Sequence, residues 1–209
     1  MSPRTADPAI RRALVEAAAR SIAAHEPLST RKLAAEVGSS TMSVYTHFGS
    51  MEELRREVRR EGFARLADHL SRVEQTDDPL VDVARQGWEY CMNAVENPNL
   101  YRAMFMETAI DEADAEVGFY TFQMLIDVLQ RCIDAELFTE TDAEWLAMQV
   151  WTSIHGSVAL YVTGFLDLDT LLRVTLVAAR TQFVSFGASP ERVDRSLAAA
   201  NFGPVPQTA

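Results

Sequence analysis

The sequence predicts an all-α protein, and three observations support this prediction. Helix start signals recur along the chain, apolar residues recur at helical spacing between them, and no stretch alternates with the period of two that is typical of a half-buried strand. The chain has 209 residues, of which 48% are hydrophobic and 23% are charged, as is usual for a globular protein. We therefore expect one sizeable helical domain or two smaller ones.

The helix starts are marked by residues that cap a helix N-terminus. Four patterns place a capping side chain before a proline at the first helical position, namely Asp7-Pro8, Asp78-Pro79, Asn97-Pro98 and Ser189-Pro190. Ser50 and Thr141 are each followed three residues later by Glu, which fits a capping box. With the apolar periodicity, these signals predict helices at residues 8–25, 29–36, 40–47, 50–73, 78–96, 98–107, 115–135, 140–164, 168–186 and 190–200.

The net charge of −11 is unevenly distributed along the chain. Residues 1–75 hold 12 Lys and Arg against 10 Asp and Glu, whereas residues 76–209 hold 7 against 20. This asymmetry favours two parts with different partners, although acidity also simply keeps a protein in solution. Because the charge balance changes at a polar stretch, we expect a first domain at 1–50, a connecting helix at 51–74 and a second domain at 75–209.

The segment STRKLAAEVGSSTMSVYTHF, residues 29–48, predicts two short helices joined by a tight turn. Ser29 can cap the first helix, and Gly38 fits the left-handed position that ends it. Val44 and Phe48 lie one turn apart and can pack the second helix onto the first. Such a pair is typical of a helix-turn-helix, whose second helix enters the major groove of DNA.

The outer face of the second helix carries hydroxyl, thioether, phenol and imidazole groups, which can contact base edges, thymine methyls and phosphates. We predict DNA contacts for Ser40, Thr41, Met42, Ser43, Tyr45, Thr46 and His47. This helix has no Lys or Arg, so phosphate contacts are expected from Thr30, Arg31 and Lys32 at the preceding helix start, with Arg4, Arg11 and Arg12 flanking them. The alternative is that any short helix pair has some exposed polar face.

Four features of this region match one known pattern: Thr30-Arg31 at a helix start, Gly38 in the turn, Tyr45-Thr46-His47-Phe48, and Ser50 followed by Leu54. With them, residues 10–70 resemble the DNA-binding domain of the tetracycline-repressor (TetR) family of bacterial transcription regulators. The resemblance implies that Thr30 and Arg31 meet phosphate, that Thr41 and Met42 face base edges, and that Tyr45 and His47 hold the DNA backbone.

One position departs from the family pattern. Where the family usually has a lysine that opens the fourth helix, this chain has Met51. The resemblance therefore implies that a usual phosphate contact is missing. Ser50 or the helix N-terminus itself is expected to replace it.

The stretch VWTSIHGSVALYVTG, residues 150–164, carries Trp151, His155 and Gly156 on one helix. It resembles a C-terminal domain of the Trp-His-Gly type that occurs in part of the TetR family. This resemblance implies a two-fold homodimer formed by the last long helices, here near 140–164 and 168–186. It also implies that the helices before them enclose a ligand.

The residues themselves also favour a dimer. The 140–164 helix is apolar nearly all round, so it must be covered on both sides, and a second copy of the chain is a suitable cover. Gly156 and Ser157 would allow another helix to approach closely. The alternative is a central core helix within a monomer.

Bulky and soft side chains are concentrated in residues 88–126 and 151–161. The predicted ligand-binding residues are Trp88, Met92, Tyr101, Met104, Phe105, Phe119, Phe122, Met124, Trp151 and His155. Each of them taken singly also suits an ordinary core position. Because basic residues are few here, we expect a neutral or cationic ligand that is mostly hydrophobic.

Other classes of function are poorly supported by the sequence. Cys91 or Cys132 with His155 is the one thiol and imidazole combination, and neither cysteine stands in a nucleophile motif. The four histidines are scattered without metal-ligand spacing, so no metal and no cofactor are expected. No signal peptide or spanning segment is recognised, which predicts a cytoplasmic protein.

These observations together predict a DNA-binding domain of three helices, joined by a long fourth helix to a helical domain for ligand binding and dimerisation. We expect a non-enzymatic transcriptional repressor that binds a palindromic DNA operator as a dimer and is released by a small hydrophobic effector. The alternative is a dimeric helical scaffold that binds DNA or protein, with a closed core and no effector.

Overall fold

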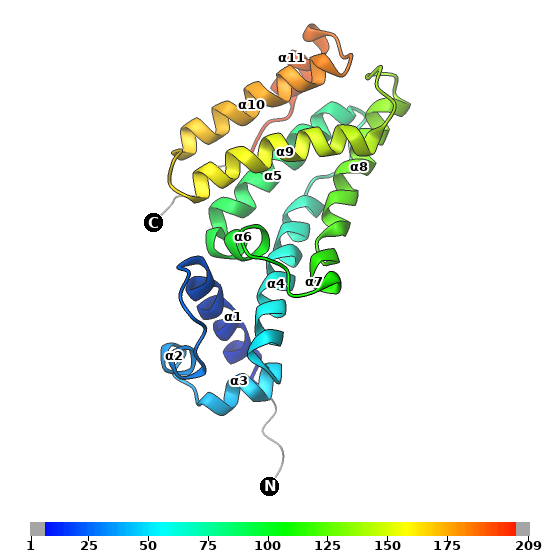
Figure 1. Cartoon of the computed structure of the whole chain (residues 1–209). Helices are drawn as coiled ribbons and strands as arrows, with labels where there is room; N and C mark the ends of the chain where they lie inside the picture. The colour runs from blue at the N-terminus through cyan, green and yellow to red at the C-terminus, as the bar shows by residue number, and fades with distance from the viewer. Residues whose placement is uncertain (1–6, 204–209) are drawn as a thin grey trace. The chain divides into compact units, whose positions relative to one another are not determined.

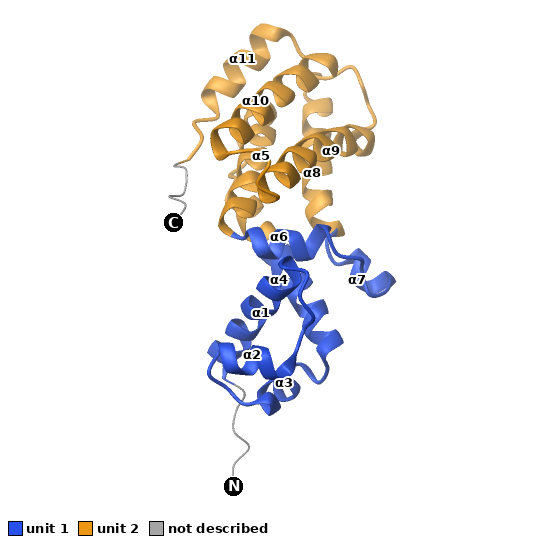
Figure 2. Ribbon diagram, turned by 60° about the vertical axis from the view of Figure 1, so that its left-hand side comes forward, with its two compact units in different colours: residues 1–65, 97–118 blue, residues 66–96, 119–209 orange. Residues whose placement is uncertain are grey.

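The computed structural model describes residues 7–203 and contains two compact units, which Figure 2 shows in two colours. The first unit comprises residues up to 65 together with 97–118, and the second comprises residues 66–96 and 119 onward. All regular structure in residues 7–203 is helical, which confirms the all-α prediction (Figure 1). In this part of the chain, no helix is long and apolar enough to cross a membrane.

The first unit is built around the N-terminal helices. Its elements are α1 (Pro8–Ala23), α2 (Thr30–Glu36), α3 (Thr41–Phe48), most of α4 (Met51–Ser71), α6 (Pro98–Phe105) and α7 (Glu112–Glu116). Leu14, Leu33, Val44 and Leu54 are fully buried in one apolar core, which α6 completes with Leu100. This core is what holds α2 and α3 in place.

The second unit is a bundle of longer helices. It contains the end of α4, α5 (Pro79–Glu96), α8 (Phe119–Asp134), α9 (Ala143–Val162), α10 (Leu168–Ser185) and α11 (Pro190–Ala199). Helices α9 and α10 lie side by side, and α5 packs against α8, α9 and α11 (Figure 1). Leu80, Leu129, Leu146 and Phe183 lie at the centre of the core.

Most predicted helices agree with the structure within about two residues, but the helix expected at 115–135 is divided. The chain forms α7 and α8 there, separated by a break at residues 117–118. Gly118 lies against the ring of Phe63, whose atoms would be 2.1 to 2.7 Å from a Cβ at this position. The break thus lies at a tertiary contact that apolar periodicity does not reveal.

Three of the capping assignments were wrong. Ser29 and Asn97 make no side-chain capping bond, and the Asn97 amide oxygen instead accepts a hydrogen bond from Arg65 at 2.7 Å. Asp142, rather than Thr141, caps α9 by accepting a hydrogen bond from the Trp145 amide at 3.0 Å. A carboxylate is a strong acceptor for these free amides and is favoured by the helix dipole.

The other capping side chains act as expected. Asp7 accepts from the Ala9 amide at 2.8 Å, Asp78 from Leu80 at 3.1 Å, and Ser189 from Arg192 at 3.3 Å. Asp78 also accepts a hydrogen bond from Ser196 on α11 at 2.7 Å. The Asp78 carboxylate thus caps the start of α5 and also links α11 to α5.

The division into units differs from the expected domains. The expected boundary lies near residues 74–78, whereas the units divide within α4, between residues 65 and 66, and the first unit also takes 97–118. Tertiary packing explains the difference, because α6 contributes Leu100 and Ala103 to the core around α1. A segment distant in sequence therefore completes the N-terminal unit.

Candidate nucleic-acid interface and cavity

The turn between α2 and α3 has the geometry of a tight helix end. Gly38 adopts a φ of +66°, the left-handed conformation that glycine tolerates best, as predicted. The amide of Ser39 donates to the carbonyl of Ala34 at 2.8 Å, which closes the end of α2. Residues 37–40 then carry the chain directly into α3.

Helix α3 is held by two side chains and presents the rest outward. Val44 is fully buried and Phe48 nearly so, which confirms that these two residues pack α3 onto its unit. Met42 is 65% exposed and Tyr45 is 47% exposed. Both are large groups that a soluble domain would normally cover, so their exposure suits a surface that meets another molecule.

The remaining predicted DNA-contacting residues are accessible to different degrees. Arg31, Ser40, Thr41, Thr46 and Ser50 are exposed, and Thr30, Ser43 and His47 are half-buried. Together with Met42 and Tyr45, these residues form what is called here the reading surface. All ten are at least partly accessible, so each can be reached by a large ligand.

Several hydroxyl groups on this surface are already oriented by local bonds. The Thr46 hydroxyl donates to the carbonyl of Met42 at 2.8 Å, and the hydroxyls of Ser40 and Ser43 lie 3.2 Å apart. Ser50 accepts from the amide of Glu53 at 3.0 Å, so its own proton remains available to a phosphate oxygen. The surface is thus preorganised through short side chains.

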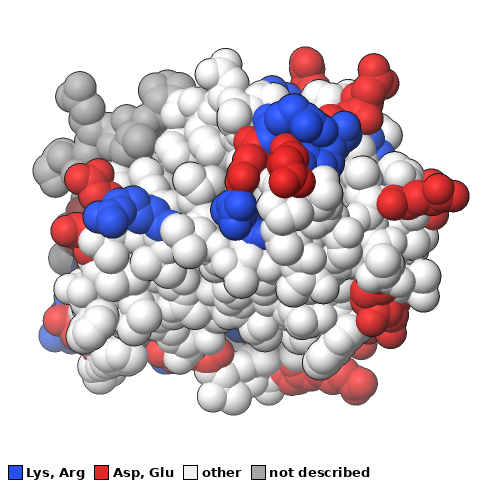
Figure 3. Space-filling view, turned by 90° about the horizontal axis from the view of Figure 1, so that it is seen from above, with Lys and Arg blue, Asp and Glu red and all other residues white. Residues whose placement is uncertain are grey.

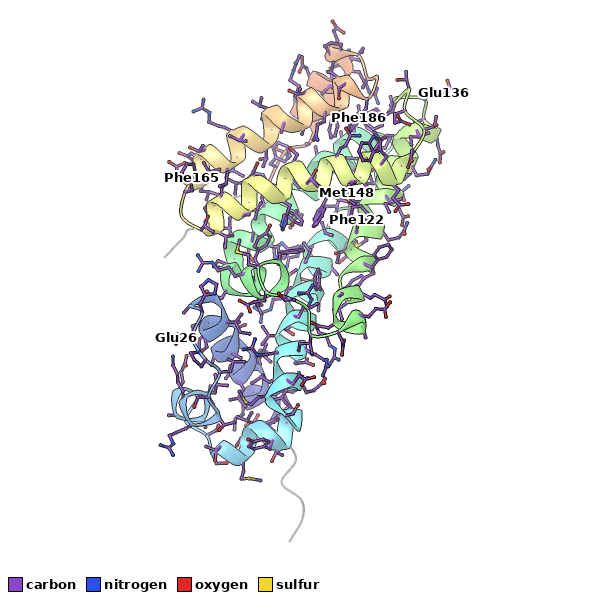
Figure 4. The ribbon with its side chains drawn as sticks, viewed as in Figure 1. Glu26, Phe122, Glu136, Met148, Phe165 and Phe186 are labelled. Atoms are coloured by element: carbon purple, nitrogen blue, oxygen red, sulfur yellow. The ribbon has the colours of Figure 1, made fainter. Side chains whose placement is uncertain are left out.

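The cations around the reading surface fall into two groups, and those of the first group already form ion pairs with carboxylates. Arg11 pairs with Glu57 at 2.7 Å, Arg20 pairs with Glu36 at 2.6 Å, and Lys32 pairs with Glu26, which lies in the loop before α2 (Figure 4).

In contrast, Arg12 and Arg31 form no ion pair within residues 7–203. Arg31 therefore offers an uncompensated guanidinium for phosphate at the start of α2, whereas Lys32 must first release its carboxylate partner. Arg4, the other predicted flanking cation, lies outside the described residues.

Met51 has a structural role that its sequence position does not reveal. It is half-buried against the core that contains Leu14 and Val44, at the first residue of α4. Methionine at this position adds an apolar side chain to the core packing of the first unit.

Two arginines of α4, Arg56 and Arg59, are half-buried by contacts with α7 and the residue before it. Arg56 pairs with Asp111 at 2.6 Å and with Glu52 at 2.8 Å, and Arg59 donates to the carbonyl of Asp114 at 3.1 Å. Hydrogen bonds from the Asp114 amide and from Arg56 hold the pKa of Asp111 below its usual value. These bonds fasten α7 to α4 within the first unit.

The second unit contains a cavity of about 150 Å³ among α5, α9, α10 and α11. Its lining is almost entirely apolar. The lining residues are Val83, Ala84, Gly87, Trp88, Cys91, Val150, Ser153, Ile154, Leu172, Thr175, Leu176, Ala178, Ala179, Gln182, Phe183, Leu197 and Phe202. A concave apolar site with a few polar groups is the usual form of a small-molecule site.

Of the ten predicted ligand-binding residues, Trp88 alone lines this cavity. Tyr101, Met104 and Phe105 belong to the first unit, where Phe105 packs on Phe63 and on Tyr101 at 5.4 and 5.0 Å between ring centroids. Phe119 is 62% exposed at the start of α8. These aromatic residues fill or flank cores instead of lining the cavity.

The other predicted ligand residues lie in the second unit, away from the cavity. The Trp151 indole stacks on His155 at 4.9 Å and meets Phe122 edge-on at 6.0 Å. The Tyr90 hydroxyl lies 3.0 Å from Nδ1 of His155. Met92 is buried on α5 and Met124 is half-buried on α8. Burial lowers the pKa of His155, which favours a neutral imidazole in this cluster.

The cavity-lining residues that the sequence prediction missed are mainly small or aliphatic. Ala84 and Gly87 on α5 lie across from Ala178 and Ala179 on α10, and it is small residues on facing helices that leave space. The aromatic and methionine side chains singled out in the sequence fill space. The feature of the sequence that could have indicated the cavity is therefore the set of small residues at 84, 87, 178 and 179.

The titratable groups give no support for catalysis. Burial raises the pKa of both the Cys91 and the Cys132 thiol to about 12, so neither forms a thiolate nucleophile near neutral pH. Within residues 7–203, no group of three or more His, Cys, Asp or Glu side chains is arranged to hold a metal ion.

Comparison with known proteins identifies two matching families of domains. Residues 14–58 match the family described as bacterial regulatory proteins, tetR family. Residues 83–179 match the family described as tetracyclin repressor-like, C-terminal domain. The first match contains α2 and α3, and the second contains most of the cavity lining.

Individual relatives agree with these matches. An HTH-type transcriptional regulator of Mycobacterium tuberculosis is 30% identical over 149 residues, which span 69% of this chain and 66% of that protein. A protein of unknown function from Rhodococcus sp. RHA1 has a TM-score of 0.72 at 22% identity, covering 89% of this chain and 99% of its own. TylP, a TetR regulator of Streptomyces fradiae, has a TM-score of 0.66 at 20% identity, covering 90% and 92%.

Proposed function

We propose, because this chain belongs to the TetR family of bacterial regulatory proteins, that it is a repressor that binds a palindromic DNA operator as a homodimer and is released by a small hydrophobic effector. Members of this family are DNA-binding regulators and not enzymes. The observation that carries the proposal is the reading surface itself. Val44 and Phe48 hold α3 in the core, while Met42, Tyr45 and Arg31 are exposed on the same pair of helices.

The chemistry of the reading surface supports sequence-dependent contact with DNA. Met42 offers an apolar group for a thymine methyl, and the hydroxyls of Thr41 and Ser43 suit base edges or phosphates. Arg31 supplies the electrostatic component that α3 lacks, since it is exposed and free of carboxylate partners in the described chain. The net charge of −11 does not oppose this, because local geometry and local charge govern the contact.

The surface of α9 and α10 supports a dimer. A stripe of α9 exposes Trp145, Met148 and Leu160, and α10 exposes Val174 and Val177, with exposures from 38% to 65%. Gly156 lies within the α9 part of this stripe, and no heavy atom lies within 4 Å of where its Cβ would be. We call this set of residues the apolar stripe. A second copy of the chain, placed by a two-fold axis, would cover it.

Charged side chains are grouped on one face of the protein. On the face that Figure 3 shows, Lys and Arg side chains lie next to Asp or Glu side chains, with uncharged residues between these groups. Two copies joined through the apolar stripe would present two reading surfaces to half-sites about 34–36 Å apart. Effector binding that favours a different spacing would lower the affinity for DNA by a coupling free energy of about 1–3 kcal/mol.

The test is fluorescence anisotropy with pooled promoter fragments of the source genome across a salt series. The wild-type protein is expected to bind a subset of fragments with a steep dependence on salt. Tyr45→Ala should weaken that binding by about 1–3 kcal/mol, and Arg31→Ala should lower the salt slope by about one ion per reading surface.

Tyr120→Ala is the matched control, because Tyr120 is 46% exposed and belongs to α8 of the second unit instead of the helix-turn-helix. It should bind DNA as the wild type does. Weak binding that no fragment, salt concentration or substitution changes would contradict the proposal.

A further inference from the structure

We infer that the cavity among α5, α9, α10 and α11 is the effector site, and that it takes a small uncharged molecule of about one ring with one or two hydrogen-bonding groups. This assignment rests on the proposed function for what the occupied site controls. The site itself rests on the geometry of the second unit, and none of the predicted ligand residues except Trp88 belongs to it.

The cavity is closed on one side by the segment that follows α11. The guanidinium Nε of Arg85 donates to the carbonyl of Ala200 at 2.8 Å, and the Phe202 ring stacks on Trp88 at 5.2 Å with 20° between the ring planes. We call residues 200–203 the C-terminal strap. Ala200 is fully buried against Val81 and Ala84 of α5, so the strap is a packed wall of the site.

The lining excludes charged ligands. None of the described residues that line the cavity is Asp, Glu, Lys, Arg or His, so a charge inside it would lose its hydration without a counterion. The apolar lining favours a hydrophobic ring or short chain. The sequence prediction of a neutral or cationic ligand is therefore narrowed to a neutral one.

Polar groups on the lining define where hydrogen bonds can form. Thr175 donates to the carbonyl of Leu171 at 2.9 Å, and the Gln182 amide nitrogen donates to the carbonyl of Gln149 at 2.9 Å, so both of these donors are occupied. Within residues 7–203, the Ser153 hydroxyl and the Trp88 indole N–H have no hydrogen-bond partner. A ligand hydroxyl or carbonyl could pair with either.

The volume limits the size of the ligand. Apolar cavities of roughly 150 Å³ in other proteins hold a single benzene-sized molecule. The present cavity has the same volume of about 150 Å³, so a monocyclic alcohol or phenol fits without displacing the core. A larger ligand would extend beyond the cavity, whose lining residue Leu176 is 43% exposed.

The site also has a route to the dimer. Leu172 and Leu176 of α10 line the cavity, while Val174 and Val177 of the same helix belong to the apolar stripe. A ligand that shifts α10 therefore acts directly on the helix that the second copy would contact. Occupancy of the cavity and the contact between the two copies are thus linked through one helix.

The test uses 4-fluorobenzyl alcohol as the probe and fluorine NMR of the full chain in the absence of DNA. The wild type should bind the probe saturably, and 4-fluorobenzoate, its anionic counterpart, should bind about tenfold or more weakly. Ala179→Leu fills the cavity and should abolish saturable binding. Ala198→Leu, on the exposed side of α11, is the matched control and should bind as the wild type does.

Two further variants distinguish the cavity from the aromatic cluster around His155 and control for a loss of binding through misfolding. Phe202→Ala opens the C-terminal strap and should weaken probe binding, whereas His155→Gln alters the other aromatic cluster and should leave binding unchanged. Equal binding by wild type and Ala179→Leu, or loss of binding in His155→Gln alone, would place the ligand elsewhere and overturn the inference. Tight binding of the benzoate, or no binding of the alcohol, would overturn the ligand class.

The DNA readout is kept separate so that the two proposals can fail separately. Saturable probe binding in a protein that binds no promoter fragment would refute the proposed function and leave the cavity as a ligand site. DNA binding that is unchanged at saturating probe would refute the effector role of the cavity. Release of DNA by the probe from wild type, and not from Ala179→Leu, would support both.

Discussion

Individual residues in the second unit show how burial changes the value of an ion pair. Asp82 is 2% exposed on α5, where it accepts hydrogen bonds from Arg131 at 2.6 Å and from the Thr76 hydroxyl at 2.7 Å. Arg131 also donates to the carbonyl of Thr76 at 2.7 Å. The Asp82 carboxylate and the Arg131 guanidinium therefore hold together α5, α8 and the loop before α5 that contains Thr76.

Removal of the Arg131 guanidinium should be costly for this reason. Arg131→Met leaves the buried Asp82 carboxylate without its cation, and the free energy of unfolding should fall by about 2–4 kcal/mol in urea titrations. Arg180→Met is the control, because the Arg180 pair with Asp194 is exposed. If both substitutions lowered the free energy of unfolding by a similar small amount, the hydrogen bonds around Asp82 would contribute little to stability.

His155 should make stability depend on pH. Burial lowers the pKa of His155 in the folded chain, so the unfolded chain takes up this proton at a higher pH than the folded chain does. Its contribution to stability is therefore present above the unfolded pKa of about 6.5 and is lost as the pH falls through that value toward the folded pKa.

Thermal melts followed by circular dichroism between about pH 5 and pH 8 measure this contribution. The melting temperature of the wild type should fall more steeply on acidification than that of His155→Gln. His25→Asn serves as the control, since the His25 side chain is 81% exposed. Parallel curves for wild type and His155→Gln would contradict the assignment.

At the scale of elements, the break between α7 and α8 contains one close approach, that of Gly118 to the Phe63 ring. An added Cβ at Gly118 would overlap the Phe63 ring, so Gly118→Ala should lower stability by about 1–3 kcal/mol. Phe63→Leu removes the overlapping ring atoms. The cost of Gly118→Ala should therefore be smaller in the Phe63→Leu background, as a double-mutant cycle by urea unfolding would show. Equal costs in both backgrounds would assign the effect to backbone freedom alone.

At the scale of the whole molecule, the apolar stripe should decide the oligomeric state. Val177 is 65% exposed, so Val177→Asp costs the isolated chain little, while a dimer would bury two unpaired carboxylates. The dissociation constant of the dimer, measured by sedimentation equilibrium, should rise by about 100-fold or more. DNA binding should be lost as well. Ala198→Asp on α11 should sediment as the wild type does. A dimer that survives Val177→Asp would place the interface elsewhere.

The turn between α9 and α10 shows that exposure alone does not define an interface. Phe165, labelled in Figure 4, is 78% exposed in this turn, and it is followed by the capping residue Asp167, which accepts from the Thr170 amide at 2.8 Å. A single exposed aromatic residue in a turn is ordinary. The apolar stripe is different because its members recur along the same faces of two adjacent helices.

The sequence by itself determined the helices and the helix-turn-helix. Capping residues, apolar periodicity and a turn glycine act over a few positions, so Gly38, Val44 and Phe48 could be assigned their structural roles from local pattern alone. The outward position of Met42 and Tyr45 follows from the same helical geometry. Whether they touch DNA remains a prediction.

Only the tertiary structure decided where empty space remains. Aromatic and methionine residues such as Tyr101, Met104 and Trp151 attract attention in a sequence, yet large side chains fill interiors instead of hollowing them. The cavity arises where small residues from α5 and α10 face one another. Trp88 lines it together with Phe202, which stacks on the Trp88 ring from the segment after α11. These pairings join residues from 91 to 114 positions apart, so no local pattern can encode them.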